Sequence, residues 1–457
     1  MNNMRHFKPR VFAVVLAAVL ALSLNVWAFA SNFVDMPDDW SRPVLEAAVD
    51  NGLLMGDGRN QINAHASLTR AELAAIIVRA YGSAAPGDLS GYTDVAPGDW
   101  YYDCLAQVAR MEVLAGEDTL MAPSRPVSRQ EALVALARAM DLEDGTIEDL
   151  EAFEDAADVA DWALGPVAAM VKAGYADVGE DGRLDPTGNI TRAQFAQVMY
   201  NTFACYIREP GEVTEIPEGN VIINSDGVTL KDVTVKGDLI IGDGVGSGEA
   251  RLEGVTVEGT VIVRGGGENS VYFEDCKLDL IKINKPFQGE GTTPLRLVFL
   301  GSTSSTVRIE VVSLDSNVII DGTVGTITIK GKYAFLKVSG KVKAIFVIGE
   351  GATIENSGTI KNLNAGTDVT VTGKGKVENI KGDGNVTDDN GNKVKPQPPY
   401  IPPYVPPVTP SVPPSESASV PPSQSQPGGS ESQPGGESQP GGESQPGGES
   451  STGNQNP

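Results

Sequence analysis

The stretch LTRAELAAII, residues 68–77, decides how the first part of this chain folds, because its pattern returns twice. The second copy is VSRQEALVAL, residues 127–136, and the third is ITRAQFAQVM, residues 190–199. Each copy places a Ser or Thr, then an Arg, then a Glu or Gln two residues after the Arg, just before an apolar run. We call this element the box. Three boxes predict three structural repeats.

The hydroxyl residue and the Glu or Gln of each box predict the start of a helix. A Ser or Thr at the N-cap accepts a backbone N–H of the first turn, and a Glu or Gln three residues later reaches back to the N-cap N–H. The three pairs are Thr69 with Glu72, Ser128 with Glu131, and Thr191 with Gln194. Helix capping explains these residues without any ligand.

Helix capping does not explain the arginine of each box. Arg70, Arg129 and Arg192 fall at the first helical position, where a cation opposes the helix dipole at a cost of about 0.3–1 kcal/mol. Free N–H groups, a positive helix end and a guanidinium that can hold a carboxylate through two hydrogen bonds would together form an anion site. The alternative is an internal ion pair between each arginine and an aspartate of its own repeat.

Other features recur in a fixed order around each box. Every repeat opens with an aromatic residue, any residue and an aspartate, and a tryptophan follows shortly after. An amphipathic segment and a loop rich in Gly and Asp then lead to the box. The aspartates are Asp35, Asp94 and Asp155, and the tryptophans are Trp40, Trp100 and Trp162.

This order of features resembles the S-layer homology (SLH) domain, in three tandem copies from residue 33 to about 205. The resemblance implies a pseudo-threefold, all-α domain with grooves between the repeats. It also implies binding to the anionic, often pyruvylated, secondary cell wall polymer that is linked to peptidoglycan. By the same resemblance, the residues that face the grooves and bind the polymer are Asp35, Trp40, Arg70, Asp94, Trp100, Arg129, Asp155, Trp162 and Arg192.

The three repeats also depart from one another. Ala64 stands where the other two repeats have Pro123 and Pro186, and Gln194 stands where the other boxes have a glutamate. These differences put equal occupancy of the three grooves in doubt. The tryptophans themselves have two interpretations, as aromatic plates that stack on a sugar or as core and groove-wall residues.

From about residue 212 the composition changes to Val, Ile, Thr, Gly and Lys with alternating polarity. LKDVTVKGDLII, residues 230–241, is echoed 22 residues later by LEGVTVEGTVIV, residues 252–263. Frames such as GTVGTI at residue 322 recur at residues 340, 358 and 375, with spacings of 18, 18 and 17. Short strands with glycine at a fixed coil length predict an all-β parallel β-helix, or solenoid. A β-sandwich would also alternate, but its turns need no fixed period.

Catalysis by the solenoid is the alternative to a purely structural role. A wall-anchored polysaccharide lyase or glycoside hydrolase needs clustered carboxylates beside an Arg or Lys. Asp232, Asp238 and Asp243 scatter around turns, so we expect no enzyme. A basic run could meet an anionic glycan or simply keep the surface soluble. It comprises Lys330, Lys332, Lys337, Lys341 and Lys343.

The ends of the chain and its domain boundaries can also be predicted. Residues 1–30 have the basic start, apolar run and AFA site of a signal peptide, and no later stretch is apolar enough to span a bilayer. Residues 393–457 are rich in Pro and repeat ESQPGG, which predicts a disordered tail. Between them we expect three repeats at 31–90, 91–150 and 151–208, a linker at 209–219 and the solenoid at 220–392. The protein is expected at the surface of a Gram-positive-type bacterium.

Composition excludes several other functions. The formal net charge of -25 argues against nucleic acid as a partner. His65 is the one histidine after residue 30, and no Cys-x-x-Cys exists, so we expect no metal and no cofactor. The three cysteines lie too far apart in the chain for a disulfide framework and are interpreted as small buried hydrophobes; they are Cys104, Cys205 and Cys276.

The stretch from Asp177 resembles a calcium loop but lacks its final glutamate, which favours an ordinary turn. Besides the polymer, other glycans or surface proteins are expected as partners of the solenoid.

Overall fold

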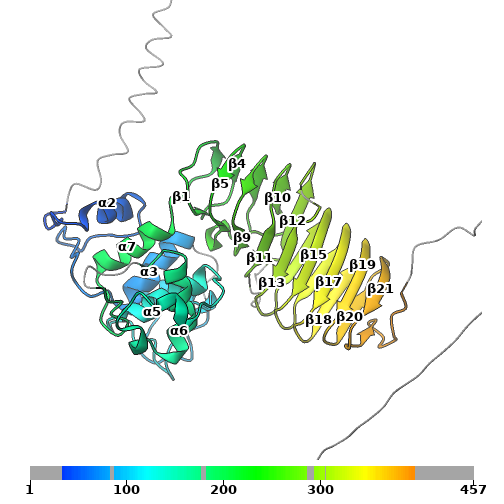
Figure 1. Ribbon diagram of the computed structural model, residues 1–457, viewed down its shortest axis with the longest axis horizontal. Helices are drawn as coiled ribbons and strands as arrows, with labels where there is room; N and C mark the ends of the chain where they lie inside the picture. Colours follow the sequence, from blue (N-terminus) through cyan, green and yellow to red (C-terminus); the bar gives the residue numbers. More distant parts are fainter. Residues whose placement is uncertain (1–32, 83–86, 177–181, 286–292, 304, 397–457) are drawn as a thin grey trace, which may run out of the picture. The chain divides into compact units, whose positions relative to one another are not determined.

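The computed structural model describes residues 33–82, 87–176, 182–285, 293–303 and 305–396. The predicted signal peptide lies outside the described residues, and so does the predicted tail from residue 397 onward. A helical region comes first along the chain, and a stack of β-strands follows (Figure 1). Within the described ranges, no helix combines the length and the apolar character needed to cross a membrane.

The region predicted as all-α has six α-helices in its described part, with long loops between them, so its helical content is lower than the prediction implies. Two short 3-10 turns, η2 (Ile147–Leu150) and η3 (Ala156–Asp158), lie in one of these loops. The α-helices are α2 (Arg42–Asp50), α3 (Arg70–Tyr81), α4 (Tyr102–Arg110), α5 (Arg129–Ala139), α6 (Asp161–Lys172) and α7 (Arg192–Thr202).

Helices α3, α5 and α7 each begin at a box arginine, as the boxes predict. In all three, the N-cap hydroxyl accepts the N–H of the residue three positions on, and that residue's side chain accepts the N-cap N–H. The capping boxes are therefore confirmed. Their N-cap residues are Thr69, Ser128 and Thr191.

The residues just before the three boxes meet in a closed ring of backbone hydrogen bonds. The N–H of Leu68 donates to the carbonyl of Ile190 at 2.8 Å, and the N–H of Ile190 donates to Val127 at 3.0 Å. The N–H of Val127 closes the ring on Leu68 at 2.9 Å. We call Leu68, Val127 and Ile190 the box ring. All three side chains are fully buried, so the ring relates the repeats to one another around a common centre.

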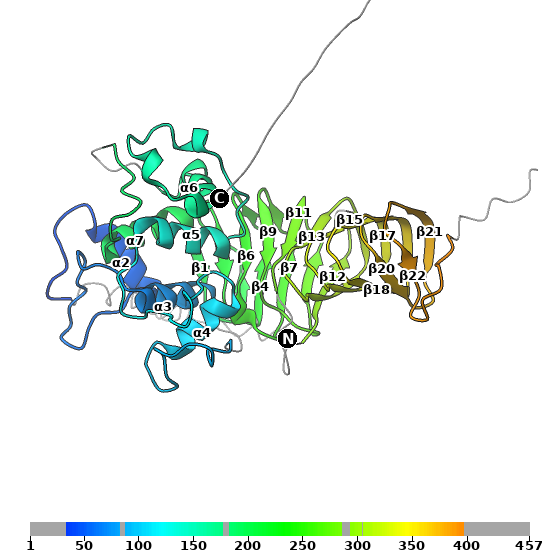
Figure 2. The ribbon, with the colours of Figure 1, turned by 90° about the horizontal axis from the view of Figure 1, so that it is seen from below.

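The β-region is a parallel solenoid, as predicted. Its strands form two ten-stranded sheets in which every pairing is parallel and each strand pairs with strands of the neighbouring coils (Figures 1 and 2). Ten strands in each sheet correspond to about ten coils. One sheet contains β1 (Cys205–Ile207), β3 (Val221–Ile223), β6 (Leu239–Ile241), β9 (Thr260–Val263), β11 (Leu280–Ile283), β13 (Arg308–Val311), β15 (Thr323–Ile329), β17 (Lys341–Val347), β19 (Thr359–Ala365) and β21 (Lys376–Lys381).

The second sheet carries the other strand of each coil. Its alternate side chains fill the interior, as Val318 and Ile320 do from β14. Its strands are β2 (Gly211–Val213), β4 (Val228–Lys231), β7 (Ala250–Glu253), β10 (Val271–Glu274), β12 (Leu295–Leu300), β14 (Asn317–Asp321), β16 (Phe335–Val338), β18 (Ala352–Asn356), β20 (Val369–Thr372) and β22 (Val386–Thr387). A third, two-stranded sheet joins β5 (Thr234–Val235) to β8 (Thr256–Val257).

The solenoid starts earlier in the chain than predicted. Strand β1 lies within the stretch predicted as the third repeat, and β2 lies within the predicted linker at 209–219. β1 pairs with β3, and β2 pairs with β4, so both belong to the first coil. Two three-residue strands in a segment rich in Pro and Glu give almost no alternation, which is why the sequence favours a linker there.

The first coils share an apolar core with the helices. Ile222 of β3, Ile240 of β6 and Ile262 of β9 belong to the buried cluster of the helical region, whereas their strand neighbours fill the solenoid interior. The backbones also approach closely. A Cβ on Gly82, at the end of α3, would lie 2.3 Å from the Cα of Gly244. The helical region and the start of the solenoid are therefore packed together without a spacer.

Polar side chains also make contacts where the helical region meets the solenoid. Asn224 donates to the carbonyls of Arg79 and Ala80 at 3.1 and 2.9 Å, which satisfies the end of α3. Arg264 Nε donates to Asp243 at 2.9 Å, and both side chains are almost fully buried. A buried ion pair of this kind fixes geometry more than it adds stability, because both charges lose their hydration.

Candidate binding groove between the repeats

The aspartate near the start of each repeat closes the loop that leads to the box. The carboxylate of Asp35 accepts the N–H groups of Ile62 and Asn63 at 2.6 and 2.9 Å. Asn63 has a left-handed backbone, with φ at 52°. The same contacts recur from Asp94 to Met121 and Ala122, and from Asp155 to Leu184 and Asp185. The structure thus gives all three predicted aspartates a loop-closing role, and none of them is among the residues that line the hollows described below.

Asp155 shows how strongly this loop closure favours the charged carboxylate. Burial acts to raise its pKa, but the N–H groups of Leu184 and Asp185 outweigh that effect. Arg183, 3.6 Å away, adds to the stabilisation of the anion. The pKa of Asp155 is therefore lowered, and the loop is held by an ionised side chain at neutral pH.

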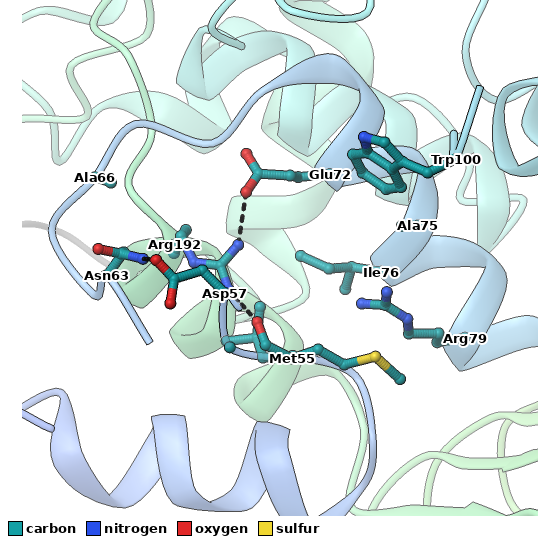
Figure 3. A pocket seen from close by; sticks show the side chains of 12 residues that line it. Met55, Asp57, Asn63, Ala66, Glu72, Ala75, Ile76, Arg79, Trp100 and Arg192 are labelled. Carbon is teal, nitrogen blue, oxygen red and sulfur yellow. Dashed lines mark hydrogen bonds and ion pairs between the residues drawn. The ribbon is translucent and has the colours of Figure 1, made fainter. Parts of the chain in front are cut away.

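Arg192 of the third box reaches into the first repeat. Its Nε donates to the carbonyl of Ile62 at 2.8 Å and its Nη2 to the carbonyl of Met55 at 2.7 Å. Its Nη1 donates to the Glu72 carboxylate at 2.8 Å. Figure 3 shows the Arg192 guanidinium between Glu72 and Met55. The side chain is 9% exposed, so most of its hydrogen-bonding capacity serves contacts between repeats.

Arg70 of the first box makes the equivalent contacts with the second repeat. Its Nε and Nη2 donate to the carbonyls of Met121 and Ala115 at 2.8 and 2.6 Å, and its Nη1 lies 3.6 Å from Glu131. The internal ion pair therefore runs to the box glutamate of a neighbouring repeat and not to the aspartate of the same repeat. Arg129 is half-buried, and the third box has Gln194 where the other two boxes have a glutamate.

The helix ends do not form the anion site that free N–H groups would offer. The N–H groups of Arg70 and Ala71 donate to the carbonyls of Arg125 and Pro123, both at 3.0 Å. The first two N–H groups of α5 and of α7 are paired in the same way with the preceding loops of other repeats. This part of the prediction is wrong because carbonyls of a neighbouring repeat already occupy the N-terminal turn.

The tryptophans lie at the surface. Trp40, Trp100 and Trp162 are 53%, 63% and 54% exposed, so they are not core residues. Trp100 and Trp162 each line a hollow, which agrees with the groove-wall interpretation. Large aromatic side chains usually bury most of their area, and three exposed ones at equivalent places are available for contact with a ligand. Stacking on a sugar remains a prediction.

One open groove of about 550 Å³ lies where the third repeat meets the first. Figure 3 shows Asn63 and Asp57 on one side of Arg192, with Ile76, Arg79 and Trp100 on the other. We call it the repeat-1 groove. The polar and aromatic side chains that line it are Asp57, Asn63, Glu72, Arg79, Trp100 and Arg192.

Arg79, like Asp57 and Asn63, lines the groove without having been predicted from the sequence. It stands on α3 nine residues after the box arginine, is half-buried, and donates from Nη1 to the carbonyl of Leu53 at 2.9 Å. Within the described residues, no carboxylate forms an ion pair with it. The signal that could have found it is Arg138, which follows the second box arginine at the same distance.

The groove also has a fixed negative charge. Asp57 accepts the N–H groups of Gln61 and Arg59 at 3.0 and 2.8 Å, which lowers the pKa of its carboxyl to about 2. The groove is therefore lined by two acidic side chains, Asp57 and Glu72, and two basic ones, Arg79 and Arg192, of which Glu72 and Arg192 pair with each other. A saccharide that carries both hydroxyl groups and an acidic substituent can find partners for each in such a site.

No group of three or more metal-ligating side chains is assembled within the part of the chain that the structure describes. The stretch that resembles a calcium loop begins at residues 177–181, which lie outside the described residues. The three cysteines form no disulfide. In the solenoid basic run, Lys330, Lys332 and Lys337 pair with glutamates of neighbouring coils at 2.8–3.0 Å.

Comparison with known proteins agrees with the repeats. Residues 32–74, 91–133 and 152–196 each match the S-layer homology domain. A surface-layer 125 kDa protein of Lysinibacillus sphaericus is 31% identical over 230 residues, which are 48% of this chain and 19% of that protein. An amylopullulanase of Thermoanaerobacterium thermosulfurigenes is 26% identical over 175 residues, 38% of this chain and 9% of that protein. A surface layer protein of Brevibacillus choshinensis is 31% identical over 147 residues, 29% of this chain and 13% of that protein.

The chain thus carries three SLH domains followed by a β-solenoid. It spans less than a fifth of the length of each of these relatives. The domains and the surface-layer relatives indicate a protein anchored to the cell wall at the surface of a Gram-positive-type bacterium.

Proposed function

We propose that this SLH protein is a non-catalytic component of the cell envelope, and that its repeats bind an anionic, pyruvylated secondary cell wall polymer. In this proposal the solenoid is held at the wall by the repeats and is displayed for adhesion or for a structural role. Other glycans or surface proteins are its expected contacts.

The repeat-1 groove is the observation that carries the polymer-binding part of the proposal. It combines an exposed indole at Trp100 with the guanidinium of Arg79, which no described carboxylate neutralises. A sugar ring can stack on an exposed indole, and a carboxylate substituent can accept hydrogen bonds from a guanidinium. The box arginines support the groove from behind, because their carbonyl contacts fix the loops that form its wall.

The candidate carboxylates of the solenoid favour a non-catalytic role. Asp243 is 4% exposed and is occupied by Arg264, and Asp238 accepts the N–H of Thr260 at 2.7 Å. Both side chains therefore serve the packing of neighbouring coils. A glycosidase of the alternative kind would need two carboxyl groups that converge on one substrate. The name of the amylopullulanase relative describes that protein, of which this chain matches 9%.

A wall-binding assay tests the proposal. The chain from residue 31 onward is incubated with purified walls that retain the secondary polymer and with walls from which acid has extracted it. Binding that depends on the polymer is expected, and equal binding to both preparations would contradict the proposed ligand. The same walls, analysed afterwards for newly released reducing sugars, test the enzyme alternative, because any release above that of untreated walls would favour it.

A further inference from the structure

The first and second inter-repeat grooves are built from equivalent positions, and one of these positions differs strongly in size and charge. Four residues before the box arginine, the first repeat has Ala66, the second has Arg125 and the third has Gly188. Ala66 is exposed and lines the repeat-1 groove. The contrast between Ala66 and Arg125 decides how much space is left beside the box glutamate.

In the first repeat, the place beside Glu72 is open. Glu72 accepts a hydrogen bond from Arg192 at 2.8 Å on the inner side, and Ala66 adds only a methyl group on the outer side. The groove therefore reaches from Trp100 past Arg79 to the Glu72–Arg192 pair. A ligand that stacks on Trp100 has access to the whole row of polar groups.

In the second repeat, Arg125 fills the equivalent place. Both of its terminal nitrogens hydrogen-bond to the Glu131 carboxylate, with Nη1 at 3.1 Å from Oε2. Glu131 thus has two cationic neighbours: the exposed Arg125, which hydrogen-bonds to it, and the buried Arg70, which lies 3.6 Å away. A two-point contact between a guanidinium and a carboxylate is strong and directional, so the groove is closed by a side chain of the repeat itself.

The hollow that remains in the second repeat has the wrong charge for an anionic polymer. It measures about 430 Å³, includes Trp162, and does not have Arg70 or Glu131 among its lining residues. Its charged lining residues are one guanidinium and three carboxylates, namely Arg138, Glu112, Asp141 and Asp144. Excess negative charge repels an anionic ligand before contact.

The solenoid borders the same hollow. Asn284, which follows β11, is one of its lining residues, and Lys282 of β11 donates to the carbonyl of Asp141 at 3.0 Å. These contacts place the second-repeat hollow against the solenoid. Among the described residues, those that line the repeat-1 groove all come from the three repeats.

Of the first two grooves, we propose that the repeat-1 groove is the principal polymer site, and that Arg125 keeps the second groove closed by occupying Glu131. Residue identity at the position four before the box arginine, Ala66 or Arg125, then determines which of these two grooves is open. This inference rests on the proposed polymer binding and assigns it to one groove of the two, with an acidic sugar as the ligand class.

Reciprocal substitutions test the inference in the full chain from residue 31. Both positions are exposed, so Ala66→Arg and Arg125→Ala are compatible with the fold. Ala66→Arg places a second guanidinium beside Glu72 and should weaken binding of acid-released, purified wall polymer at least about tenfold, since a charge-assisted contact and the open volume are both lost. Ala66→Gln, which adds length without charge, separates the effect of volume from that of the ion pair.

Arg125→Ala should leave the affinity of the principal site unchanged within about twofold, because the repeat-1 groove is intact. Arg308→Ala is the matched control, since it removes one exposed arginine from the solenoid surface, where Arg308 pairs with Asp279. Titration calorimetry gives affinity and stoichiometry, and thermal melts verify folding. Wild-type affinity in Ala66→Arg, or a loss in Arg125→Ala as large as that in Ala66→Arg, would overturn the inference.

The two proposals fail in different ways. If the unaltered chain does not bind the polymer, the proposed function is wrong. If it binds, but Trp162→Ala weakens binding while Trp100→Ala does not, the repeats bind the polymer through another groove, and only the assignment to the repeat-1 groove is wrong.

Discussion

Arg192 and Glu72 are 120 residues apart in the chain, and their side chains meet at 2.8 Å. This pair joins the third box to the first, as Arg70 and Glu131 join the first box to the second. The arginine that is unfavourable for its own helix is thus used by the neighbouring repeat, where it satisfies two loop carbonyls and a carboxylate. For Arg70 and Arg192, the presence of Arg in the box is explained by contacts between repeats.

Arg192→Ala is expected to destabilise the fold. It leaves the carbonyls of Ile62 and Met55 without their donor and Glu72 without its cation, at a cost of about 2–4 kcal/mol in the free energy of unfolding. Urea denaturation of the full chain measures this cost. Glu72→Gln is the control, because the third box has Gln194 at the same position, and it should cost less than about 1 kcal/mol. A normal melt for Arg192→Ala combined with lost wall binding would instead show that Arg192 is a ligand contact.

Trp100→Ala is expected to weaken wall binding and to leave the melting temperature nearly unchanged, because the side chain is 63% exposed. Loss of a stacking contact should reduce affinity by about fivefold or more. Co-sedimentation with purified walls and a thermal melt give the two quantities. Trp40→Ala is the companion variant, since Trp40 is nearly as exposed but is not among the residues that line the repeat-1 groove. Equal binding by Trp100→Ala and the unaltered chain would exclude stacking there.

Thr191→Ala is expected to lower stability by about 1 kcal/mol through the loss of the helix cap on α7. Thr191→Ser should restore most of that loss, because a hydroxyl at the N-cap can again accept the N–H of Gln194. Chemical denaturation compares the three chains. If Thr191→Ser is destabilised as much as Thr191→Ala, the missing methyl group of Thr191, and not the missing helix cap, causes the loss of stability.

The Arg125–Glu131 pair should make stability depend on acid. Burial acts to raise the pKa of Glu131, but hydrogen bonds from Arg125 and Ser128 outweigh it, and the pKa lies below its ordinary value of 4.5. A carboxyl group whose pKa is lower in the folded chain than in the unfolded chain stabilises the fold at pH values above the unfolded pKa. This stabilisation is lost as the pH falls through the pKa of the folded chain. Arg125→Ala should therefore be less stable than the unaltered chain at pH 7. The difference should shrink when denaturation is repeated near pH 3, and an equal difference at both values would contradict this.

Arg264→Ala tests the boundary between the helices and the solenoid. Removing Arg264 leaves Asp243 buried without its cation and should cost about 3–5 kcal/mol. Because Ile222, Ile240 and Ile262 join the two cores, the loss should shift a single unfolding transition rather than separate two. Calorimetry of the described region, residues 33–396, measures this. If Arg264→Ala instead shows two transitions, and the later one keeps the melting temperature of the unaltered chain, the solenoid unfolds independently of the helices.

Much of the architecture could be predicted because it depends on local spacing. The capping boxes need only residues three positions apart, and the coils need only glycine and alternating hydrophobics at a fixed period. The loop-closing aspartates and the role of the box arginines could not be predicted, since their partners lie 27 to 137 residues away. Neither could the effect of Ala66 and Arg125, which depends on a groove formed by separate repeats.

The shared core shows in the burial of the strands and not in their sequence alone. Strands β3 and β14 both contain the run VII, but β3 buries all three of these residues, whereas β14 leaves the middle one, Ile319, half-buried. A strand that is apolar on both faces is buried on both faces only where another layer covers it. The helices provide that layer for β3, β6 and β9.

The box ring has a consequence for the order in which the protein becomes functional. A chain is synthesised from its N-terminus, so Leu68 and Val127 become available before Ile190, whose carbonyl is the acceptor for Leu68. Two repeats on their own leave the ring open, with Arg70 able to find Glu131 but Arg192 absent from the first repeat. The repeat-1 groove, which needs Arg192, is completed last. If the repeat-1 groove is the polymer site proposed above, a chain that ends before Arg192 has no complete site, whatever its first two repeats have formed.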